Sequence, residues 1–315
     1  MRPLSRSTVV GGIVVGVLAV STAAVLARLA MGEQPGVTTA AAGSAPALAV
    51  AFWRTTLGAA ALAPLGWRAA RRDAVRLPAA QHRRLAASGL ALALHFALFQ
   101  GAIALTTVAS AVTLATMSPL FVALGGRWLL GESTSRRTWA GMSLTMVGAL
   151  VIGAADLRAA DLGTTALIGD AMALGSAVAV TGYLLIGRVA RRSVPATTYS
   201  AIVYGWAALA LLPVCLATGT PLTGFTTGTW LAILGIVVGP QLLGHSVFNA
   251  LLSTIPATLV SIVVLAEPVG AGLLAWLLLG ESPAGFYFLG APFVLLGVLI
   301  ATAARDPAPP PSAEP

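Results

Sequence analysis

The fold class of this chain is decided by residues 253–282, which read STIPATLVSIVVLAEPVGAGLLAWLLLGES. This stretch is almost wholly apolar until its closing Gly-Glu-Ser, and the acid within the run is Glu267, directly before Pro268. An apolar run of this length is typical of a helix that crosses a membrane. A related stretch, SPLFVALGGRWLLGES at residues 118–133, lies 149 residues upstream, and this offset places Pro119 on Pro268.

The correspondence extends well beyond these two stretches. The same offset pairs Pro64 with Pro213, Gln100 with Asn249, Gly141 with Gly290, and Gly148 with Gly297. The first span of each copy needs an offset of 160, which places Arg28 on Arg188. The sequence therefore predicts two repeats of one membrane unit, at residues 8–155 and 164–304.

Composition supports a membrane protein. The chain is 57% hydrophobic and only 9% charged, with a mean hydropathy of +0.91, far from the values of soluble domains. We expect an all-α polytopic protein with ten transmembrane helices, five in each repeat. They are placed at about residues 8–30, 45–66, 84–104, 107–130, 136–155, 164–187, 197–217, 229–251, 255–279 and 284–304. Residues 305–315 are rich in proline and predict a disordered tail.

The arginines predict the orientation of these spans. The net charge of +8 comes from arginine alone, and the arginines fall in alternate loops. On the side of the N-terminus lie Arg2, Arg6, Arg68, Arg71, Arg72, Arg76, Arg83, Arg84, Arg136, Arg137, Arg188, Arg191, Arg192 and Arg305, whereas the opposite side carries Arg158. By the positive-inside rule both termini and the tail are cytoplasmic, and the predicted location is a bacterial inner (plasma) membrane. The basic charge then needs no nucleic-acid partner.

Five spans in a repeat is an odd number, so the second copy must enter the membrane upside down. Inverted repeats are an architecture of secondary transporters, whose substrate site lies near the midplane between the two copies.

Motifs for other functions are missing from the sequence. There is no Walker motif and no Gly-x-Ser-x-Gly elbow, and the three histidines lack the spacing of metal ligands. The single cysteine, Cys215, excludes an internal disulfide framework. We therefore expect neither an enzyme nor a cofactor or metal site.

Three stretches carry a family resemblance: residues 104–133, residues 249–282, and WLAILGIVVGPQLLGHSVFNAL at residues 230–251. They resemble the signatures of the EamA-type drug/metabolite transporter superfamily. The resemblance implies two inverted repeats of five helices. It also implies a central cavity inside the first four helices of each repeat, with the fifth and tenth helices outside it. Members export amino acids, metabolites or drugs, and others carry sugar phosphates or nucleotide sugars.

Glu267 is the main candidate for proton coupling, because an ionisable group deep inside a bilayer is costly and often functional. Burial favours the protonated form of a carboxyl group, which suits the carriage of a proton. The alternative is a structural acceptor, hydrogen-bonded to a neighbouring helix. Helix breaks are predicted at Pro119, Pro268 and Pro240.

Polar residues recur every four positions in the eighth span. Gln241, His245 and Asn249 are predicted to form one stripe on a helix face that contacts substrate. The corresponding positions in the first copy are Leu92, Phe96 and Gln100, with His95 one position away. Gln100 and His95 are also candidate contacts to substrate, although the first copy's wall should be more apolar. The alternative is polar packing between helices.

The remaining candidate contacts to substrate are Arg54 with its neighbour Trp53, and Tyr183 and Tyr204. Arg54 could attract a carboxylate, snorkel to the headgroups, or pair with Glu33 or Asp170. The two tyrosines could instead be interface anchors. Glu132 and Glu281, which follow helix-ending glycines, are interpreted as residues of the membrane interface.

The predicted function is secondary transport of small metabolites, amino acids or drug-like compounds by alternating access, in the direction of export and with proton coupling as one option. The expected partners are a small-molecule substrate and the lipid bilayer, and a homodimer is left open. The alternatives are a facilitator or exchanger that is indifferent to pH, and a membrane scaffold that transports nothing.

Overall fold

The computed structural model of the chain describes residues 4–32, 42–73, 77–106, 108–159, 164–279 and 285–303. These residues form helices and turns, with no strand among them. The first half contains α1 (Arg6–Ser21), α2 (Ala23–Met31), α3 (Ala47–Arg72), α4 (Ala79–Leu105), α5 (Val108–Ala115), α6 (Ser118–Leu130) and α7 (Arg136–Ala159). The second half contains α8 (Thr164–Ala190), α9 (Ala196–Ala217), α10 (Thr227–Ile236), the π-helix η1 (Val237–His245), α11 (Ser246–Leu251), α12 (Ala257–Val264), α13 (Glu267–Leu279) and α14 (Gly285–Ala303).

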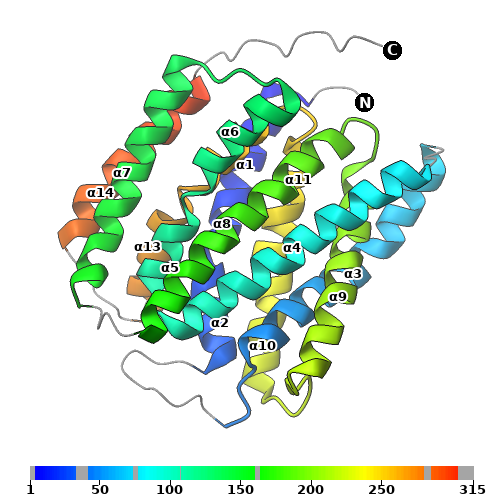
Figure 1. Cartoon of the computed structure of the whole chain (residues 1–315), viewed down its shortest axis with the longest axis horizontal. Helices are drawn as coiled ribbons and strands as arrows, with labels where there is room; N and C mark the ends of the chain where they lie inside the picture. Colours follow the sequence, from blue (N-terminus) through cyan, green and yellow to red (C-terminus); the bar gives the residue numbers. More distant parts are fainter. Residues whose placement is uncertain are drawn as a thin grey trace.

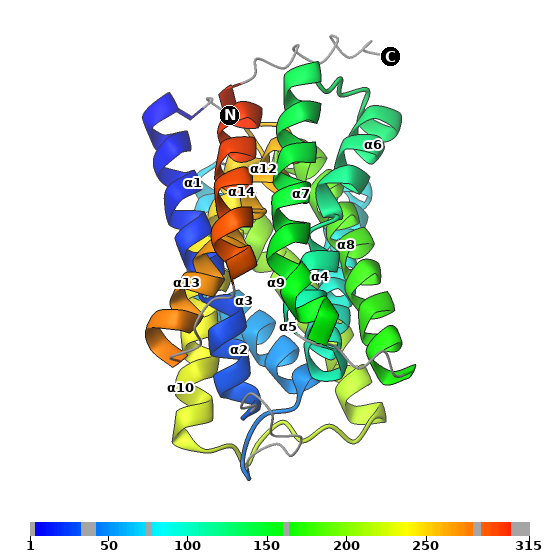
Figure 2. The same cartoon turned by 90° about the vertical axis from the view of Figure 1, so that its left-hand side faces the viewer.

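Within the described residues these segments join end to end into ten rods: α1–α2, α3, α4, α5–α6, α7, α8, α9, α10–η1–α11, α12–α13 and α14. The rods run alternately up and down through one bundle (Figures 1 and 2). The side on which α1 begins and α14 ends, at the top of Figure 2, is called the terminus side below, and the opposite side the far side. The rods α1–α2 and α8, which begin the two halves, run in opposite directions.

The molecule is an all-helical polytopic membrane protein. Eight rods in the described residues are long and apolar enough to cross a membrane, and α5–α6 and α7 are not among these eight. The segments α5 and α6 have 8 and 13 residues, so each alone is too short to span a bilayer. Large apolar side chains face outward, as Trp128, Leu129 and Leu277 do. An apolar outer surface of this kind suits contact with lipid.

Several rods are broken near their middle. The turn at residues 116–117 separates α5 from α6, and the turn at residues 265–266 separates α12 from α13. Pro119 and Pro268 stand in the first turn of α6 and α13, where a missing backbone N–H costs no helical hydrogen bond. Pro240 lies inside η1, and a π-helical stretch is a common response to an interrupted helix ladder. The breaks leave non-helical backbone in the middle of the bundle.

The closest helix contact joins α7 to α14, side by side in Figures 1 and 2. A Cβ atom at Gly141 would lie 2.6 Å from the carbonyl oxygen of Gly297, and one at Gly148 would lie 2.8 Å from that of Gly290. Glycine is therefore needed for this approach of two backbones. In the sequence repeat Gly141 corresponds to Gly290, and Gly148 corresponds to Gly297. The contacts are crossed, because Gly141 meets Gly297 and Gly148 meets Gly290. This pattern is that of two antiparallel helices related by a two-fold axis.

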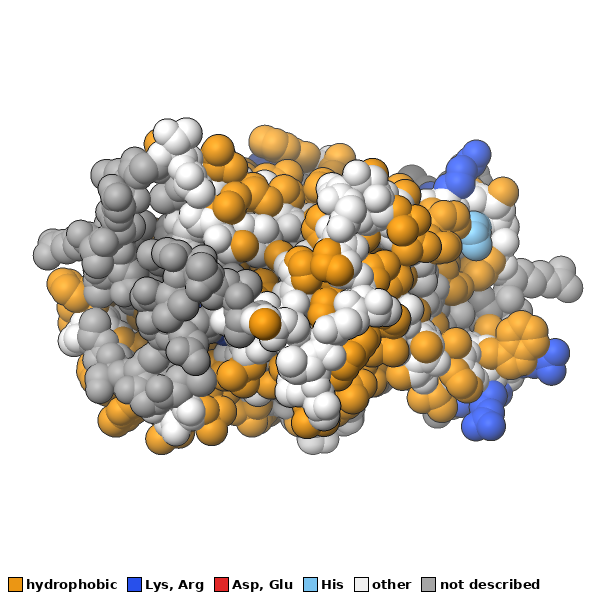
Figure 3. Space-filling view, turned by 90° about the horizontal axis from the view of Figure 1, so that it is seen from below, with side chains coloured by type: hydrophobic (Ala, Val, Ile, Leu, Met, Phe, Trp, Pro, Cys, Tyr) orange, Lys and Arg blue, Asp and Glu red, His pale blue; other side chains and the backbone are white. Residues whose placement is uncertain are grey.

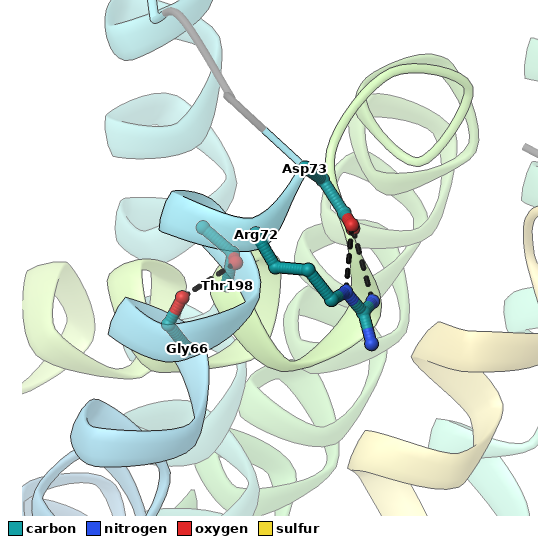
Figure 4. Close-up of polar contacts among 4 residues, drawn as sticks. All are labelled: Gly66, Arg72, Asp73 and Thr198. Carbon is teal, nitrogen blue, oxygen red and sulfur yellow. Dashed lines mark hydrogen bonds and ion pairs between the residues drawn. The ribbon is translucent and has the colours of Figure 1, made fainter.

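Packing of α3 against α9 forms another large contact, at one end of which Thr198 Oγ1 donates a hydrogen bond to the carbonyl oxygen of Gly66 (Figure 4). Just beyond, Arg72 donates from Nε to Asp73 Oδ1 at 2.8 Å and from Nη2 to Asp73 Oδ2 at 3.2 Å (Figure 4). These hydrogen bonds lower the pKa of Asp73. The pair is exposed to solvent and adds little to stability.

A second ion pair on the terminus side is buried. Arg188, near the end of α8, donates from Nε to Glu132 Oε1 at 2.9 Å, and from Nη1 to the carbonyl oxygen of Leu252 at 2.6 Å. Glu132 is only 7% exposed and lies buried against Arg188 of α8. The reason is that the chain turns at Gly131, where φ is +65°, and carries Glu132 back against α8. Glu281 lies outside the described residues.

Candidate functional site

The middle of the bundle holds a cavity with a volume of about 100 Å³. Its lining comes from α1 to α6, the turns after α5 and α12, and α8, η1, α11, α12 and α13, with none from α7, α9, α10 or α14 among the described residues. The lining residues are Val20, Ala23, Arg54, His95, Phe96, Phe99, Val112, Ala115, Thr116, Ser118, Val180, Tyr183, Leu184, Pro240, His245, Phe248, Val260, Ser261, Val264, Leu265 and Glu267.

Most of this lining consists of positions that correspond in the sequence repeat. The corresponding pairs are Val20 and Val180, Ala23 and Tyr183, Phe96 and His245, Phe99 and Phe248, Val112 and Ser261, Ala115 and Val264, Thr116 and Leu265, and Ser118 and Glu267. The broken rods α5–α6 and α12–α13 therefore line the cavity with residues that correspond to each other in the repeat.

The ionisable groups of the cavity stand where the two copies differ. Tyr183 replaces an alanine of the first copy, His245 replaces a phenylalanine, and Glu267 replaces a serine. Arg54 has Val203 as its counterpart, and Val203 does not line the cavity. The two halves thus contribute nearly equivalent positions to the cavity wall, but the ionisable groups at these positions differ between the halves.

Arg54 is buried in the wall of the cavity and is only 3% exposed. Its Nε donates a hydrogen bond of 2.9 Å to Gln241 Oε1, and its Cζ lies 3.8 Å from the centroid of the Phe96 ring. Its Nη2 is buried without a hydrogen-bond partner. Gly58, one turn further along α3, leaves room for Gln241, because a Cβ atom there would lie 3.0 Å from Gln241 Cγ. The side chain therefore does not snorkel to the headgroups.

The two acids suggested as partners of Arg54 are not seen to pair with it. Asp170 accepts a hydrogen bond of 2.9 Å from Thr106 Oγ1, and Glu33 lies outside the described residues.

Glu267 is the first residue of α13, and its side chain lines the cavity. Among the described residues its carboxyl group forms no hydrogen bond and no ion pair. A neighbouring helix that holds Glu267 as a structural acceptor is thus not observed. The N-terminus of a helix favours a negative charge, so this position favours the ionised form of the carboxyl group.

The two central histidines differ in their contacts. His95 Nδ1 lies 2.8 Å from Ser176 Oγ, and its ring stacks on Phe99. His245 forms no side-chain hydrogen bond to a described residue, and its ring meets the edge of Phe96 with 5.2 Å between centroids. The two imidazole centroids are 6.4 Å apart. His245 is therefore the freer of the two to contact a solute.

Several predicted contact residues are placed away from the cavity. Asn249 is fully buried, accepts a hydrogen bond from the Tyr183 hydroxyl and donates one of 3.0 Å to Ser200 Oγ. The Tyr204 hydroxyl lies 3.0 Å from Ser246 Oγ, and Trp53 Nε1 donates to the carbonyl oxygen of Leu222 at 2.8 Å. These groups tie helices together, which corresponds to the polar-packing alternative.

Gln241 and Gln100 are also buried and do not line the cavity. Of the expected stripe of Gln241, His245 and Asn249, His245 alone is among the described residues that line the cavity. The expectation assumed an α-helix, but η1 has the wider turn of a π-helix up to His245.

Other lining residues were missed by reasoning from the sequence. Among them are Val20, Ala23, Phe99, Thr116, Ser118, Phe248 and Ser261. A comparison of the two copies position by position contains the signal that finds them, because each has a lining counterpart. Among the described residues no cluster of three or more metal-ligand side chains occurs.

Comparison with known proteins agrees with this geometry. Residues 8–154 and 167–303 each match the profile of the EamA-like transporter family. The chain belongs to this family. It is a family of transporters rather than of enzymes, so a solute and a membrane are the partners of this EamA-like chain.

Two curated relatives of this EamA-like chain are bacterial. An uncharacterized transporter from Clostridium kluyveri is 25% identical over 213 residues, which are 67% of this chain and 68% of the relative. The uncharacterized transporter YwfM from Bacillus subtilis is 28% identical over 149 residues, 43% of this chain and 46% of the relative. A chain of known crystal structure aligns with a TM-score of 0.74 and 22% identity, covering 95% of this chain and 97% of that one. That likeness concerns the fold.

Proposed function

We propose that this EamA-like protein is a secondary transporter that exports small metabolites, amino acids or drug-like compounds by alternating access across a bacterial plasma membrane. The observation that carries the proposal is the central cavity, whose wall is built from corresponding positions of the two halves. A cavity between two repeats can open to either side of the membrane when one half moves against the other.

We propose that the two halves are inverted five-helix repeats with all ten rods spanning the membrane. Support comes from the opposite directions of α1–α2 and α8 in Figure 2 and from the reciprocal glycine contacts of α7 and α14.

The proposed orientation places both termini in the cytoplasm. It rests on the arginines of the loops on the terminus side. Figure 3 shows the molecule from below Figure 1: apolar and uncharged side chains dominate the described surface, and arginines stand out at the right-hand edge.

Glu267 is the proposed site of proton coupling. Its carboxyl group lines the cavity at the start of α13 and has no hydrogen bond to a described residue. A group in this position can exchange its proton with whichever side the cavity faces. The competing proposal, a facilitator or exchanger that is indifferent to pH, needs Glu267 to have a structural role, for which the described residues offer no partner.

The test is flux into proteoliposomes that contain the purified protein, with a labelled panel of amino acids and metabolites and with or without an imposed pH gradient. Flux that follows the gradient supports a coupled carrier. Flux that ignores the gradient favours the facilitator.

The scaffold alternative is tested by accessibility. In a Cys215→Ser background, His245→Cys should react with a water-soluble thiol reagent, because residue 245 lines the cavity. Asn249→Cys is the matched control four residues away, where the side chain is fully buried. Equal resistance of both cysteines would favour a scaffold.

A further inference from the structure

The guanidinium group of Arg54 is an unusual element of the cavity wall. A positive charge in the interior of a membrane protein is normally paired, because its desolvation is costly. Arg54 is 3% exposed and forms no ion pair with a described residue. Its contacts are a neutral amide, from Gln241, and the face of Phe96. The acid that acts on this charge electrostatically is Glu267 in the same cavity, and it forms no direct ion pair with Arg54.

Two buried donors next to each other also lack acceptors. They are Nη2 of Arg54 and Nε2 of Gln241. Gln241 must turn its oxygen toward Arg54 Nε to accept that hydrogen bond, so its NH2 group remains a donor. Buried polar groups in proteins are nearly always satisfied, so the unpartnered Nη2 of Arg54, whose side chain lines the cavity, indicates a missing acceptor.

The missing acceptor has a definable chemistry. With Nε occupied by Gln241, the guanidinium group presents its remaining N–H groups, whose fork matches the two oxygens of a carboxylate. A doubly charged phosphate fits less well, because Glu267 lines the same cavity and a single guanidinium would leave excess negative charge. The rest of the lining is mostly apolar, including Phe96, Phe99 and Phe248, and suits an apolar body.

We propose that Arg54 binds the carboxylate of the transported solute, and that the substrates are small monocarboxylates with an apolar body. This inference rests on the proposed transport function and assigns its substrate class. Gln241 is a positioning residue, since it fixes the guanidinium group through Nε. In an amino acid the carboxylate faces Arg54 and the ammonium group is free to face Glu267.

The experiment measures binding to the purified full-length protein in detergent. The probes are leucine, 4-methylpentanoate, which lacks the ammonium group, and leucinamide, which lacks the carboxylate. We expect leucine and 4-methylpentanoate to bind, and leucinamide to bind at least about tenfold more weakly, as the loss of a charged hydrogen bond predicts. Equal binding of leucine and leucinamide, or no binding of either carboxylate, would overturn the proposal.

Variants separate the charge from the fold. Arg54→Met keeps a long side chain against Phe96 and should weaken leucine binding at least about tenfold. Arg71→Met is the matched control, because Arg71 is on the same helix with its Cζ 4.4 Å from the centroid of the Trp67 ring but is exposed outside the cavity. Unchanged leucine binding by Arg54→Met contradicts the proposal.

Gln241→Glu provides a variant that should stay folded. The new carboxylate has nearly the same shape as the amide, pairs with Arg54 from within, and occupies the donors that a ligand would use. We expect an unchanged or higher unfolding temperature together with loss of leucine binding. Leucine binding at the wild-type level would refute the assigned role of Arg54.

The same proteoliposomes distinguish this inference from the transport proposal. Flux of solutes that lack a carboxylate, unaffected by Arg54→Met, leaves transport intact and refutes the carboxylate site. Carboxylate binding that depends on Arg54 but is accompanied by no flux supports the site and refutes transport.

Discussion

Removal of one member of the buried Glu132–Arg188 ion pair should destabilise the protein strongly. The pair joins the end of α6 to the end of α8, with side chains only 8% and 10% exposed. Glu132→Leu leaves the Arg188 guanidinium buried with only the Leu252 carbonyl oxygen, and Arg188→Met leaves a buried carboxylate whose Oε2 already lacks a partner. Breaking a buried pair in this way costs about 3–5 kcal/mol.

The double variant Glu132→Leu/Arg188→Met should recover part of this loss, because two apolar side chains of similar volume leave no unpaired charge. The coupling energy of the cycle should be about 1–3 kcal/mol. The assay is reversible unfolding of the four proteins in mixed micelles of increasing SDS content.

A matched control is the exposed pair of Arg72 and Asp73, whose hydrogen bonds are similarly short. Its double-mutant cycle should show no measurable coupling, because solvent screens exposed pairs. If the single variants at Glu132 and Arg188 lose less than about 1 kcal/mol, or if their effects simply add, the buried pair does not hold α6 to α8 and the reasoning fails.

Three further predictions concern the cavity and the helix contacts. Glu267→Gln should fold but lose flux driven by a pH gradient, and wild-type response to the gradient in proteoliposomes would return this residue to a structural role. Gly148→Val should lower the free energy of unfolding by about 1–3 kcal/mol or more, because the new side chain is overpacked against α14. The control Gly205→Ala should be neutral, because a Cβ atom there meets nothing within 4 Å. Equal effects of the two substitutions would contradict the close contact. Asn249→Leu should lower the free energy of unfolding by about 1–3 kcal/mol, because the Tyr183 hydroxyl and Ser200 lose their hydrogen-bond partner. The folded fraction should still bind leucine. Loss of leucine binding at full stability would show that Asn249 has a direct role in the site.

The sequence predicts the helices well because each is an apolar run with a visible end. Gly131, which ends α6, and the arginines at the start of α7 are local signals. The repeat offset also contains much of the cavity, since positions such as Phe99 and Phe248 correspond and both line it.

Other features depend on contacts between distant segments, which a single sequence does not contain. The partner of Arg54 is Gln241, which is 187 residues away and lies in the π-helix η1. The burial of Glu132 likewise depends on α8 lying against the end of α6.

The contact of α7 with α14 uses corresponding positions from both halves, since Gly141 meets Gly297 and Gly148 meets Gly290. A surface of this kind can join two separate polypeptides as well as two parts of one. A gene divided between the codons for Ala159 and Thr164 should therefore encode two fragments that complement each other when they are expressed together. The joined chain then fixes a one-to-one ratio of two halves that already fit.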